Sequence, residues 1–152
     1  MLLSFATCDT PPNTPDAFLK TRFPRLMDEM EWDSSKANEI GAFFSDSTTG
    51  VGYEVYFDKK GQFQKLYTYI NASDLPTKAE NAIQQKYPNS KLAVLSLVEI
   101  PKAKFYHVEL TNDKDYITVE VDEAGGFLNE KVVPLSEQEL RNAEEEGVDN
   151  DE

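Results

Sequence analysis

One sequence pattern recurs at a fixed offset of 64 residues, and it constrains the fold more than any other feature of the chain. The segment 57–63 (Phe-Asp-Lys-Lys-Gly-Gln-Phe) aligns with 121–127 (Val-Asp-Glu-Ala-Gly-Gly-Phe). At the same offset, Arg-Phe-Pro at 22–24 aligns with Lys-Tyr-Pro at 86–88. Two separate segments that agree on one offset indicate an internal repeat. We therefore predict a tandem duplication, with one copy over residues 14–75 and a second over 76–140.

Each copy begins with a pattern that is typical of a short helix. Thr14 is a suitable N-cap, Pro15 suits the first helical position, and Pro24 ends the helix. In the second copy, either Asp74 or a capping box of Thr77 with Glu80 is expected to begin the helix. The apolar residues that follow have helical spacing, so this helix is predicted to pack one face against a sheet.

Alternating segments predict antiparallel strands with one face buried and the other in water. Residues 53–58 and 116–122 have this pattern, and each is followed by an Asp-x-x-Gly hairpin turn. The other expected strands are 27–32, 42–45, 63–70, 92–100, 104–110 and 127–133. Each copy therefore reads as a helix followed by three or four antiparallel strands, and the predicted fold class is α+β.

The order of these motifs resembles one known family. Phe-Pro after the opening helix, Trp32, the hairpin at 53–61 (Tyr-Glu-Val-x-Phe-Asp-x-x-Gly) and Asp-Leu-Pro at 74–76 are similar to the PepSY-like, beta-lactamase-inhibitor-like proteins. The resemblance spans residues 14–135 and implies a beta-lactamase-inhibitor-like fold, a non-catalytic role and export from a Bacteroidetes-type bacterium. Trp32 is expected to pack between sheet and helix. In the second copy, the offset of 64 places Ser96 at the position that corresponds to Trp32.

Composition argues against several classes of function. The formal net charge of the 152-residue chain is −13, and such a chain repels a phosphate backbone, so we expect no nucleic-acid partner. A single Cys forbids an internal disulfide, and a single His leaves little for a transition-metal site. The sequence contains no Gly-x-Ser-x-Gly elbow and no Gly-rich phosphate loop. We therefore expect neither an enzyme nor a cofactor or metal.

The two ends of the chain differ in composition from the rest. Eight carboxylates against Arg141 alone lie in residues 136–152, so we predict that 141–152 form an acidic, disordered tail. Residues 1–13 are expected to be a leader stub and linker, with apolar residues before Cys8 and a Pro-rich segment after it. Two alternatives stay open for Cys8, a lipidated anchor or an incidental thiol. The lipid-anchor interpretation predicts an exported protein of the periplasm or cell envelope that associates with a membrane only through the lipid on Cys8.

Strand alternation also assigns side chains to the two faces of the sheet. If Val55, Phe57 and their counterparts pack against the helices, the solvent-facing side carries Phe43, Tyr56, Lys65, Tyr67, Tyr69, Phe105 and His107. His107 is expected to lie on this side near Glu109 as a surface or interface histidine. Aromatic residues are enriched at the centre of protein interfaces, so we predict that this face binds another protein.

The partner is not identified by the sequence. The family resemblance adds the expectation of an extracytoplasmic enzyme, because PepSY modules are associated with the restraint of peptidases. On this hypothesis the protein inhibits a peptidase or another hydrolase. Two alternatives stay open: the rings are covered by the other repeat or a second copy of the chain, or the protein is a structural or small-ligand-sequestering envelope protein with no enzyme target.

Overall fold

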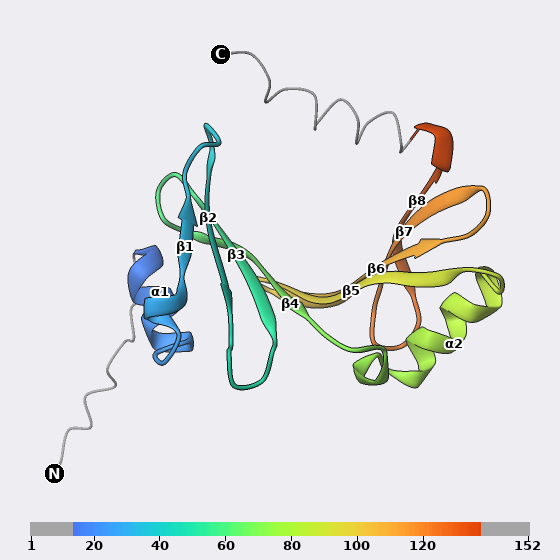
Figure 1. The fold of residues 1–152 in the computed structure, drawn as a ribbon, viewed down its shortest axis with the longest axis horizontal. Coiled ribbons are helices and arrows are strands. Elements are labelled where there is room, and N and C mark those ends of the chain that lie inside the picture. Colours follow the sequence, from blue (N-terminus) through green and yellow to red (C-terminus); the bar gives the residue numbers. More distant parts are fainter. Residues whose placement is uncertain (1–13, 138–152) are drawn as a thin grey trace, which may run out of the picture. The chain divides into compact units, whose positions relative to one another are not determined.

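The computed structural model describes residues 14–137 (Figure 1). Cys8 and the predicted acidic tail lie outside the described residues. The chain divides into two compact units, Met1–Leu66 and Tyr67–Glu152. This division falls inside a strand and differs from the boundary at 75/76 that the repeat predicts, because it follows contacts rather than sequence similarity. The boundaries of the two sequence repeats stay a prediction.

The described residues form the helical elements and strands given below, and residues 135–137 begin a further helix at the end of the described range. The helical elements are α1 (Pro15–Arg22), η1 (Met27–Glu29), η2 (Ala72–Asp74) and α2 (Thr77–Lys86). The strands are β1 (Glu31–Asp33), β2 (Glu39–Ser45), β3 (Gly52–Asp58), β4 (Phe63–Tyr69), β5 (Lys91–Ile100), β6 (Ala103–Thr111), β7 (Asp115–Val121) and β8 (Phe127–Pro134). The eight strands form an antiparallel sheet in the order β1 to β8. The predicted α+β class with antiparallel strands is therefore confirmed.

Helix α1 of the first unit begins and ends as its sequence predicts. The Thr14 side chain accepts a hydrogen bond from the Ala17 N–H at 3.1 Å, and Pro15 occupies the first turn. The helix packs a fully buried Leu19 against the strands. The first core is rich in rings: Phe18 meets Phe57 edge-on, with ring centroids 5.6 Å apart. Its buried members are Leu19, Leu26, Ala42, Phe44, Val55, Phe57 and Leu66.

The predicted strand at 27–32 is wrong over most of its length. Residues Met27–Glu29 form the 3₁₀ turn η1, and β1 is a three-residue edge strand that begins at Glu31. The apolar residues Met27 and Met30 pack against the first core. Their spacing therefore reflects this packing and not the alternation of a strand. The prediction of a core tryptophan is also wrong, since Trp32 is 48% exposed. Trp32 pairs with Ala42 of β2, and its strand β1 is an edge strand of the described sheet.

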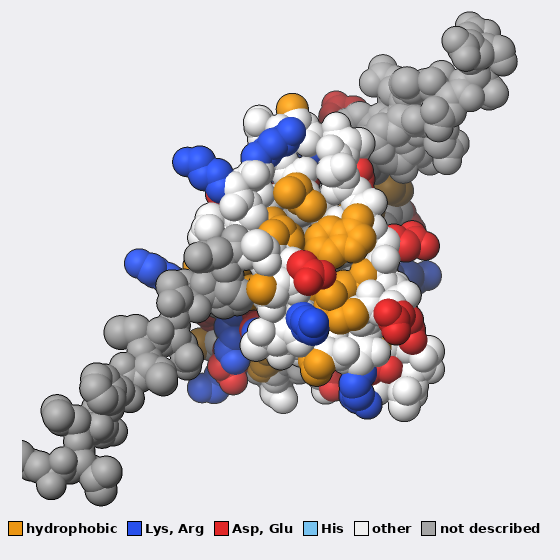
Figure 2. Space-filling view, turned by 90° about the vertical axis from the view of Figure 1, so that its left-hand side faces the viewer, with side chains coloured by type: hydrophobic (Ala, Val, Ile, Leu, Met, Phe, Trp, Pro, Cys, Tyr) orange, Lys and Arg blue, Asp and Glu red, His pale blue; other side chains and the backbone are white. Residues whose placement is uncertain are grey.

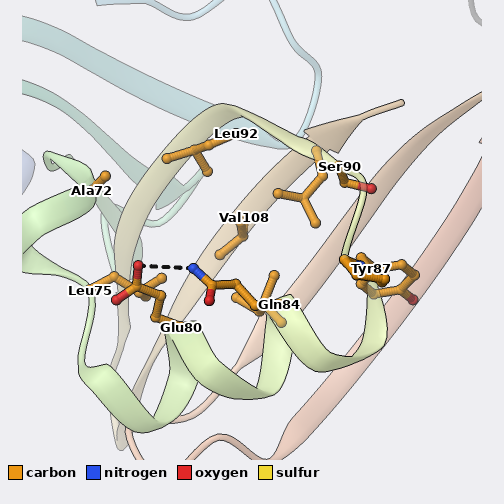
Figure 3. A pocket seen from close by; sticks show the side chains of 11 residues that line it. Ala72, Leu75, Glu80, Gln84, Tyr87, Ser90, Leu92 and Val108 are labelled. Atoms are coloured by element: carbon orange, nitrogen blue, oxygen red, sulfur yellow. Dashed lines mark hydrogen bonds between the residues drawn. The ribbon is translucent and has the colours of Figure 1, made fainter. Parts of the chain in front are cut away.

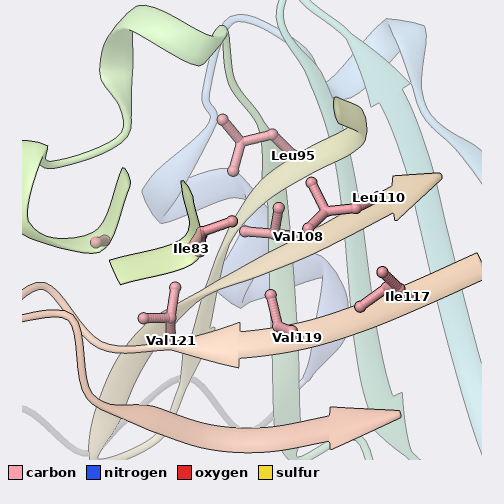
Figure 4. Packing of buried hydrophobic residues seen from close by; sticks show 8 residues of the cluster. Ile83, Leu95, Val108, Leu110, Ile117, Val119 and Val121 are labelled. Carbon is pink, nitrogen blue, oxygen red and sulfur yellow. The ribbon is translucent and has the colours of Figure 1, made fainter. Parts of the chain in front are cut away.

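The core of the second unit is aliphatic (Figure 4). Helix α2 places Ala79 and Ile83 against the strands. The other buried members of this core are Leu95, Val108, Leu110, Ile117, Val119 and Val121. Alternation in 116–122 predicted the inward direction of the last three, and the burial pattern of β7 confirms it. The helix and its strands together exclude water from one side of the second unit.

The predicted cap of α2 is not present. Pro76 occupies the N-cap position, and no side chain caps the helix. The Asp74 carboxylate instead accepts a hydrogen bond from the Asn71 N–H at 3.1 Å, within the preceding 3₁₀ turn. Asn71 and Asp74 form the capping box of η2, so the turn before the helix uses the side chain that we expected at the helix itself.

Two hairpin turns have the same hydrogen bonds at the predicted offset. The Oδ1 atom of Asp58 accepts from the backbone N–H of Lys60 and Gln62, each at 2.9 Å. Asp122 Oδ1 accepts in the same way from residues 124 and 126, at 2.9 and 2.8 Å. Gly61 and Gly125 adopt positive φ angles of 81° and 89°. The turns agree locally, whereas the duplication of the whole unit stays a prediction.

Candidate protein-binding surface

The strand register shows which side chains share each face of the second unit. Val108 lies opposite Val119, and both are in the core beneath α2. The neighbouring pair, His107 and Glu120, therefore points to the other side of the strands. Ser96 lies opposite His107 in the next strand and belongs to the same side, where it is itself buried (1% exposed). We call this side, away from α2, the open face of the second unit.

Strand β4 adds two tyrosines to the open face. Leu66 is buried and Ile70 packs against the second core, so the alternation places Tyr67 and Tyr69 on the opposite side, as predicted. Tyr69 is 39% exposed, and Tyr67 is half-buried. The Tyr67 ring meets the imidazole of His107 edge-on, with centroids 6.3 Å apart. The structure thus brings together two of the predicted site residues.

A hydrogen-bonded group surrounds this contact. His107 Nε2 lies 3.0 Å from Glu109 Oε1, which confirms the expected proximity of the two side chains. The Tyr116 hydroxyl donates a hydrogen bond to the other carboxylate oxygen of Glu109. We call Tyr67, His107, Glu109 and Tyr116 the His107 cluster. Each member is half-buried, so the group has fixed positions and still reaches solvent.

Electrostatics keeps the hydroxyl of Tyr116 protonated. Burial, the hydrogen bond to Glu109 and the charge of that carboxylate together raise the pKa of Tyr116 to about 12. At neutral pH Tyr116 is therefore the donor in its hydrogen bond to Glu109. A protonated His107 would form an ion pair with the same carboxylate. The cluster can thus present hydrogen-bond donors, an acceptor and aromatic edges to a partner.

The first unit has an aromatic pair on the corresponding side of its strands. Phe43 and Tyr56 meet edge-on with ring centroids 5.9 Å apart, and the Tyr56 hydroxyl donates to Glu54 Oε2 at 2.8 Å. Both rings lie over Gly41, where a Cβ atom would come within 2.9 Å of the Phe43 ring. The rings therefore shield a glycine backbone in the middle of a strand. This packing gives Phe43 and Tyr56 a structural role in addition to any role in binding.

The remaining predicted residues have the positions that alternation indicates. Lys65 is half-buried in β4, on the side opposite Leu66. Phe105 is half-buried in β6 opposite Val98, which is itself buried. Sequence reasoning missed Tyr116, although the polar side of the alternating segment 115–121 contained the signal, an aromatic residue among charged and polar ones. The role of Lys65 and Phe105 in binding stays a prediction.

A pocket of about 540 Å³ lies within the second unit between α2 and strands β5 and β6 (Figure 3). Ile83, Val108 and Leu110 form apolar parts of its lining, and Glu80 and Gln84 extend from the helix. Gln84 Nε2 donates a hydrogen bond to Glu80 Oε1 at 3.2 Å. The sequence did not indicate this pocket. It lies on the α2 side of the strands and is thus separate from the open face.

The family described as "Putative beta-lactamase-inhibitor-like, PepSY-like" matches residues 42–129, which is more than half of the chain. The chain belongs to this PepSY-like family. The match contains the hairpin at 53–61, helix α2 and most of the second unit, including the whole His107 cluster. The resemblance that the sequence motifs indicated is therefore confirmed.

Solved structures of similar fold come from Bacteroides species. A DUF2874 family protein from Bacteroides uniformis has a TM-score of 0.69 and 22% identity, covering 82% of this chain and 90% of its own. A BLIP-like protein from Bacteroides fragilis has a TM-score of 0.67 and 23% identity, covering 84% of this chain and 90% of its own. At these identities the likeness establishes the fold of the PepSY-like chain. No curated protein matches it.

The comparisons also indicate a class of role. The description of the PepSY-like family is that of an inhibitor-like, hence non-catalytic, module. A third structure, from Bacteroides eggerthii, is described as "putative periplasmic proteins", with a TM-score of 0.69, 16% identity, and coverage of 82% of this chain and 90% of its own. None of the described helices is long and apolar enough to span a membrane. Over the same residues, no three potential His, Cys, Asp or Glu ligands come together as a metal site.

Proposed function

We propose that this PepSY-like protein is an exported, non-catalytic module that binds another protein through the open face of its second unit. The observation that carries the proposal is the His107 cluster, where an imidazole, a carboxylate and two tyrosines meet on the side that α2 does not cover. The aromatic pair Phe43–Tyr56 offers a second contact surface on the first unit.

The chemistry of the open face suits recognition of a protein. Tyrosine gives a large contact area and a polar end at a low cost in side-chain entropy, and interface cores are enriched in it. The hydrogen bonds of Glu109 hold His107 and Tyr116 in place before binding, so little further ordering is required. A partner that covers Tyr69 also buries a ring that is 39% exposed.

We further propose that the partner is an extracytoplasmic enzyme, a peptidase or other hydrolase, and that binding inhibits it by blocking its active site. The inhibitor-like family description supports this choice. Such inhibition needs no chemistry from the binding module, only a tight surface across the entrance of the enzyme. The alternative, a small-ligand-sequestering envelope protein, is favoured by a different observation, the pocket beside α2.

Site-specific photo-crosslinking tests the proposed face directly. A photoreactive phenylalanine at position 69 is expected to capture one defined protein from the native cell envelope. The matched control is position 132 in β8, where Val132 is 51% exposed and points to the other side of the strands. Equal capture from both positions would contradict a specific open-face interface.

Once the partner is identified, Tyr67→Ala and Tyr69→Ala measure the energetic role of the face. We expect each substitution to weaken binding at least about 30-fold, which corresponds to a hot spot of about 2 kcal/mol. The melting temperature should change little, and Leu128→Ala, at a residue that is 57% exposed in β8, should leave binding intact. A large loss of stability with unchanged affinity would instead show that the tyrosines have a structural role.

The same export hypothesis includes a lipid anchor on Cys8. Each buried methylene of an acyl chain would add about 0.8 kcal/mol of membrane affinity. Cells that are fed a fatty-acid analogue should label the wild-type protein and not Cys8→Ser. Absence of label on the wild type, or equal label on both, would exclude the anchor while leaving the protein-binding proposal standing.

A further inference from the structure

We propose that the pocket beside α2 binds a small aliphatic amine, with its hydrocarbon chain against the strands and its ammonium group at Glu80. The pocket measures about 540 Å³, within the range of about 300–1,000 Å³ of small-molecule sites. It lies wholly within the second unit, and the residues that line it come from η2, α2, the turn after α2, β5 and β6. This site is independent of the open face.

The wall of the pocket is aliphatic. Its larger aliphatic side chains are Leu75, Ile83, Leu92, Val108 and Leu110, and Ala72, Tyr87 and Pro88 complete the apolar lining. Val108 and Leu110 are almost fully buried, whereas Leu92 is 43% exposed at the start of β5. Figure 3 shows Leu92 and Val108 on the strand side and Leu75 on the side of the helix. A hydrocarbon chain in this space would remove Leu92 and its neighbours from water, which is the main favourable contribution we expect.

The charge of the lining selects a cation. Among the residues that line the pocket, Glu80 is the only charged side chain, and there is no Lys or Arg. Gln84 donates to one carboxylate oxygen and holds Glu80 beside the pocket, as the dashed line in Figure 3 shows. A carboxylate accepts several hydrogen bonds at once, so the bond from Gln84 leaves room for an ammonium group. An anionic ligand would meet repulsion from Glu80 and from a chain of net charge −13.

The first unit shows why the space is open. At the offset of 64, Ser90 corresponds to Leu26, and each follows its helix with a backbone hydrogen bond of the same type, at 3.2 and 3.1 Å. Leu26 is 8% exposed and belongs to the first core. Ser90 has a much smaller side chain and lines the pocket instead. Replacing a core leucine by serine therefore leaves volume between helix and strands in the second unit.

The test compares three ligands of equal chain length: n-octylamine, n-octanol and octanoate at neutral pH. Amide shifts in NMR titrations of the full chain give both the affinity and the location. We expect n-octylamine to bind with a Kd of the order of 1 mM, given the few atoms of such a ligand, and to shift residues of α2 and the start of β5. It should bind about fivefold more tightly than n-octanol, on the scale of a surface ion pair, because Glu80 is exposed, and octanoate should bind most weakly.

Three variants test the roles of the Glu80 carboxylate and of the pocket volume at Ser90. Glu80→Gln should make n-octylamine and n-octanol bind with equal affinity. Asp16→Asn, at the corresponding position of α1, is the control and should change neither affinity. Ser90→Leu should remove binding of all three ligands, because it places in the pocket the leucine that the first unit has. If Ser90→Leu fails to fold, the amine preference and its loss in Glu80→Gln still test the proposal. Octanoate binding as tightly as n-octylamine, or shifts confined to other regions, would overturn it.

Discussion

The two units have the same order of elements, a helix followed by four strands, but they fill their cores with different side chains. In the first unit, Phe23 contacts Phe44 with ring centroids 4.9 Å apart, and Phe18 stacks on Phe63 at 4.6 Å. The second core has Val, Leu and Ile at its buried strand positions, and Tyr87 and Phe127 are only partly buried at its edge. A common backbone arrangement thus accepts either rings or branched aliphatic residues, provided that the buried face is apolar.

The predicted repeat and the strand registers together give a correspondence between residues of the two units. On the predicted repeat, the hairpin offset of 64 makes Val119 the counterpart of Val55. Ala42 pairs with Val55 and Val108 pairs with Val119, so Ala42 is equivalent to Val108. In β2 and β6 the offset is therefore 66, because the connection between β2 and β3 is longer than that between β6 and β7. A single sequence offset cannot describe both parts of the repeat.

This correspondence explains the contrast between the outer faces. On the predicted repeat, Glu109 is the counterpart of Phe43, and His107 is the counterpart of Gly41. The first unit consequently shields a glycine with rings, whereas the second has a hydrogen-bonded cluster at the same place. Figure 2 views the molecule from the side of α1 and β1, where hydrophobic side chains gather between acidic and basic ones. The first unit therefore also exposes apolar surface, including Trp32 at its edge strand.

The largest expected effect tests the difference between the two cores. Phe57→Ala should lower the free energy of unfolding by about 4 kcal/mol, because it removes a buried ring that contacts Phe18 and Phe63. The equivalent Val121→Ala should cost about 2 kcal/mol, since it removes two methyl groups. Urea denaturation followed by circular dichroism and Trp32 fluorescence measures both. Equal losses would show that the rings add nothing to the first core beyond apolar volume.

The next effect concerns Gly125, a glycine of the second hairpin that packs against helix α2. A Cβ at Gly125 would lie 2.7 Å from the backbone carbonyl oxygen of Lys78, and its φ angle is +89°. Gly125→Ala should therefore cost about 3 kcal/mol, the sum of backbone strain and a clash that no side-chain movement relieves. Gly50→Ala is the control, with φ of +74° and open space around it, and should cost about 1 kcal/mol. Similar thermal shifts in the two variants would contradict the close contact between hairpin and α2.

The smallest effect is a change in alkaline titration of the second unit. The pKa of folded Tyr116, about 12, lies above its ordinary value of 10.0. The stabilisation from its neutral hydroxyl is present below about pH 10 and is lost as the pH rises through 12. Glu109→Gln should lower the pKa of Tyr116 part of the way towards 10.0, because burial persists while the charge is removed.

Tyr87 provides the control for this titration. Burial and the hydrogen bond to Glu130, with that residue's charge, raise the pKa of Tyr87 to about 12 as well. NMR of the ring Cζ carbons should show Tyr87 unchanged in Glu109→Gln. If the pKa of Tyr116 is the same in Glu109→Gln as in the wild type, burial alone accounts for its raised value.

Local rules allowed much of the fold to be predicted. Thr14, Pro15 and Pro24 mark the ends of α1 because capping and the missing proline N–H act within a few residues. Asp58 and Asp122 specify the hairpins in the same way. Strand alternation also assigned Tyr67, Tyr69 and His107 to one face before any contact was known. The same rules misplaced the cap of α2, because Asp74 had a nearer backbone donor in Asn71.

The sequence by itself determined the two helices α1 and α2, the Asp-x-x-Gly hairpin turns and the side of the alternating strands that faces water, since these depend on neighbours along the chain. Tertiary structure decided what those faces contain. The hydrogen bond from Tyr116 to Glu109 and the contact of Tyr67 with His107 join residues of different strands. The exposure of Trp32 follows from its place at a sheet edge, and the pocket follows from serine at position 90 between a helix and two strands. Such features depend on strand register and packed volume, which no local pattern encodes.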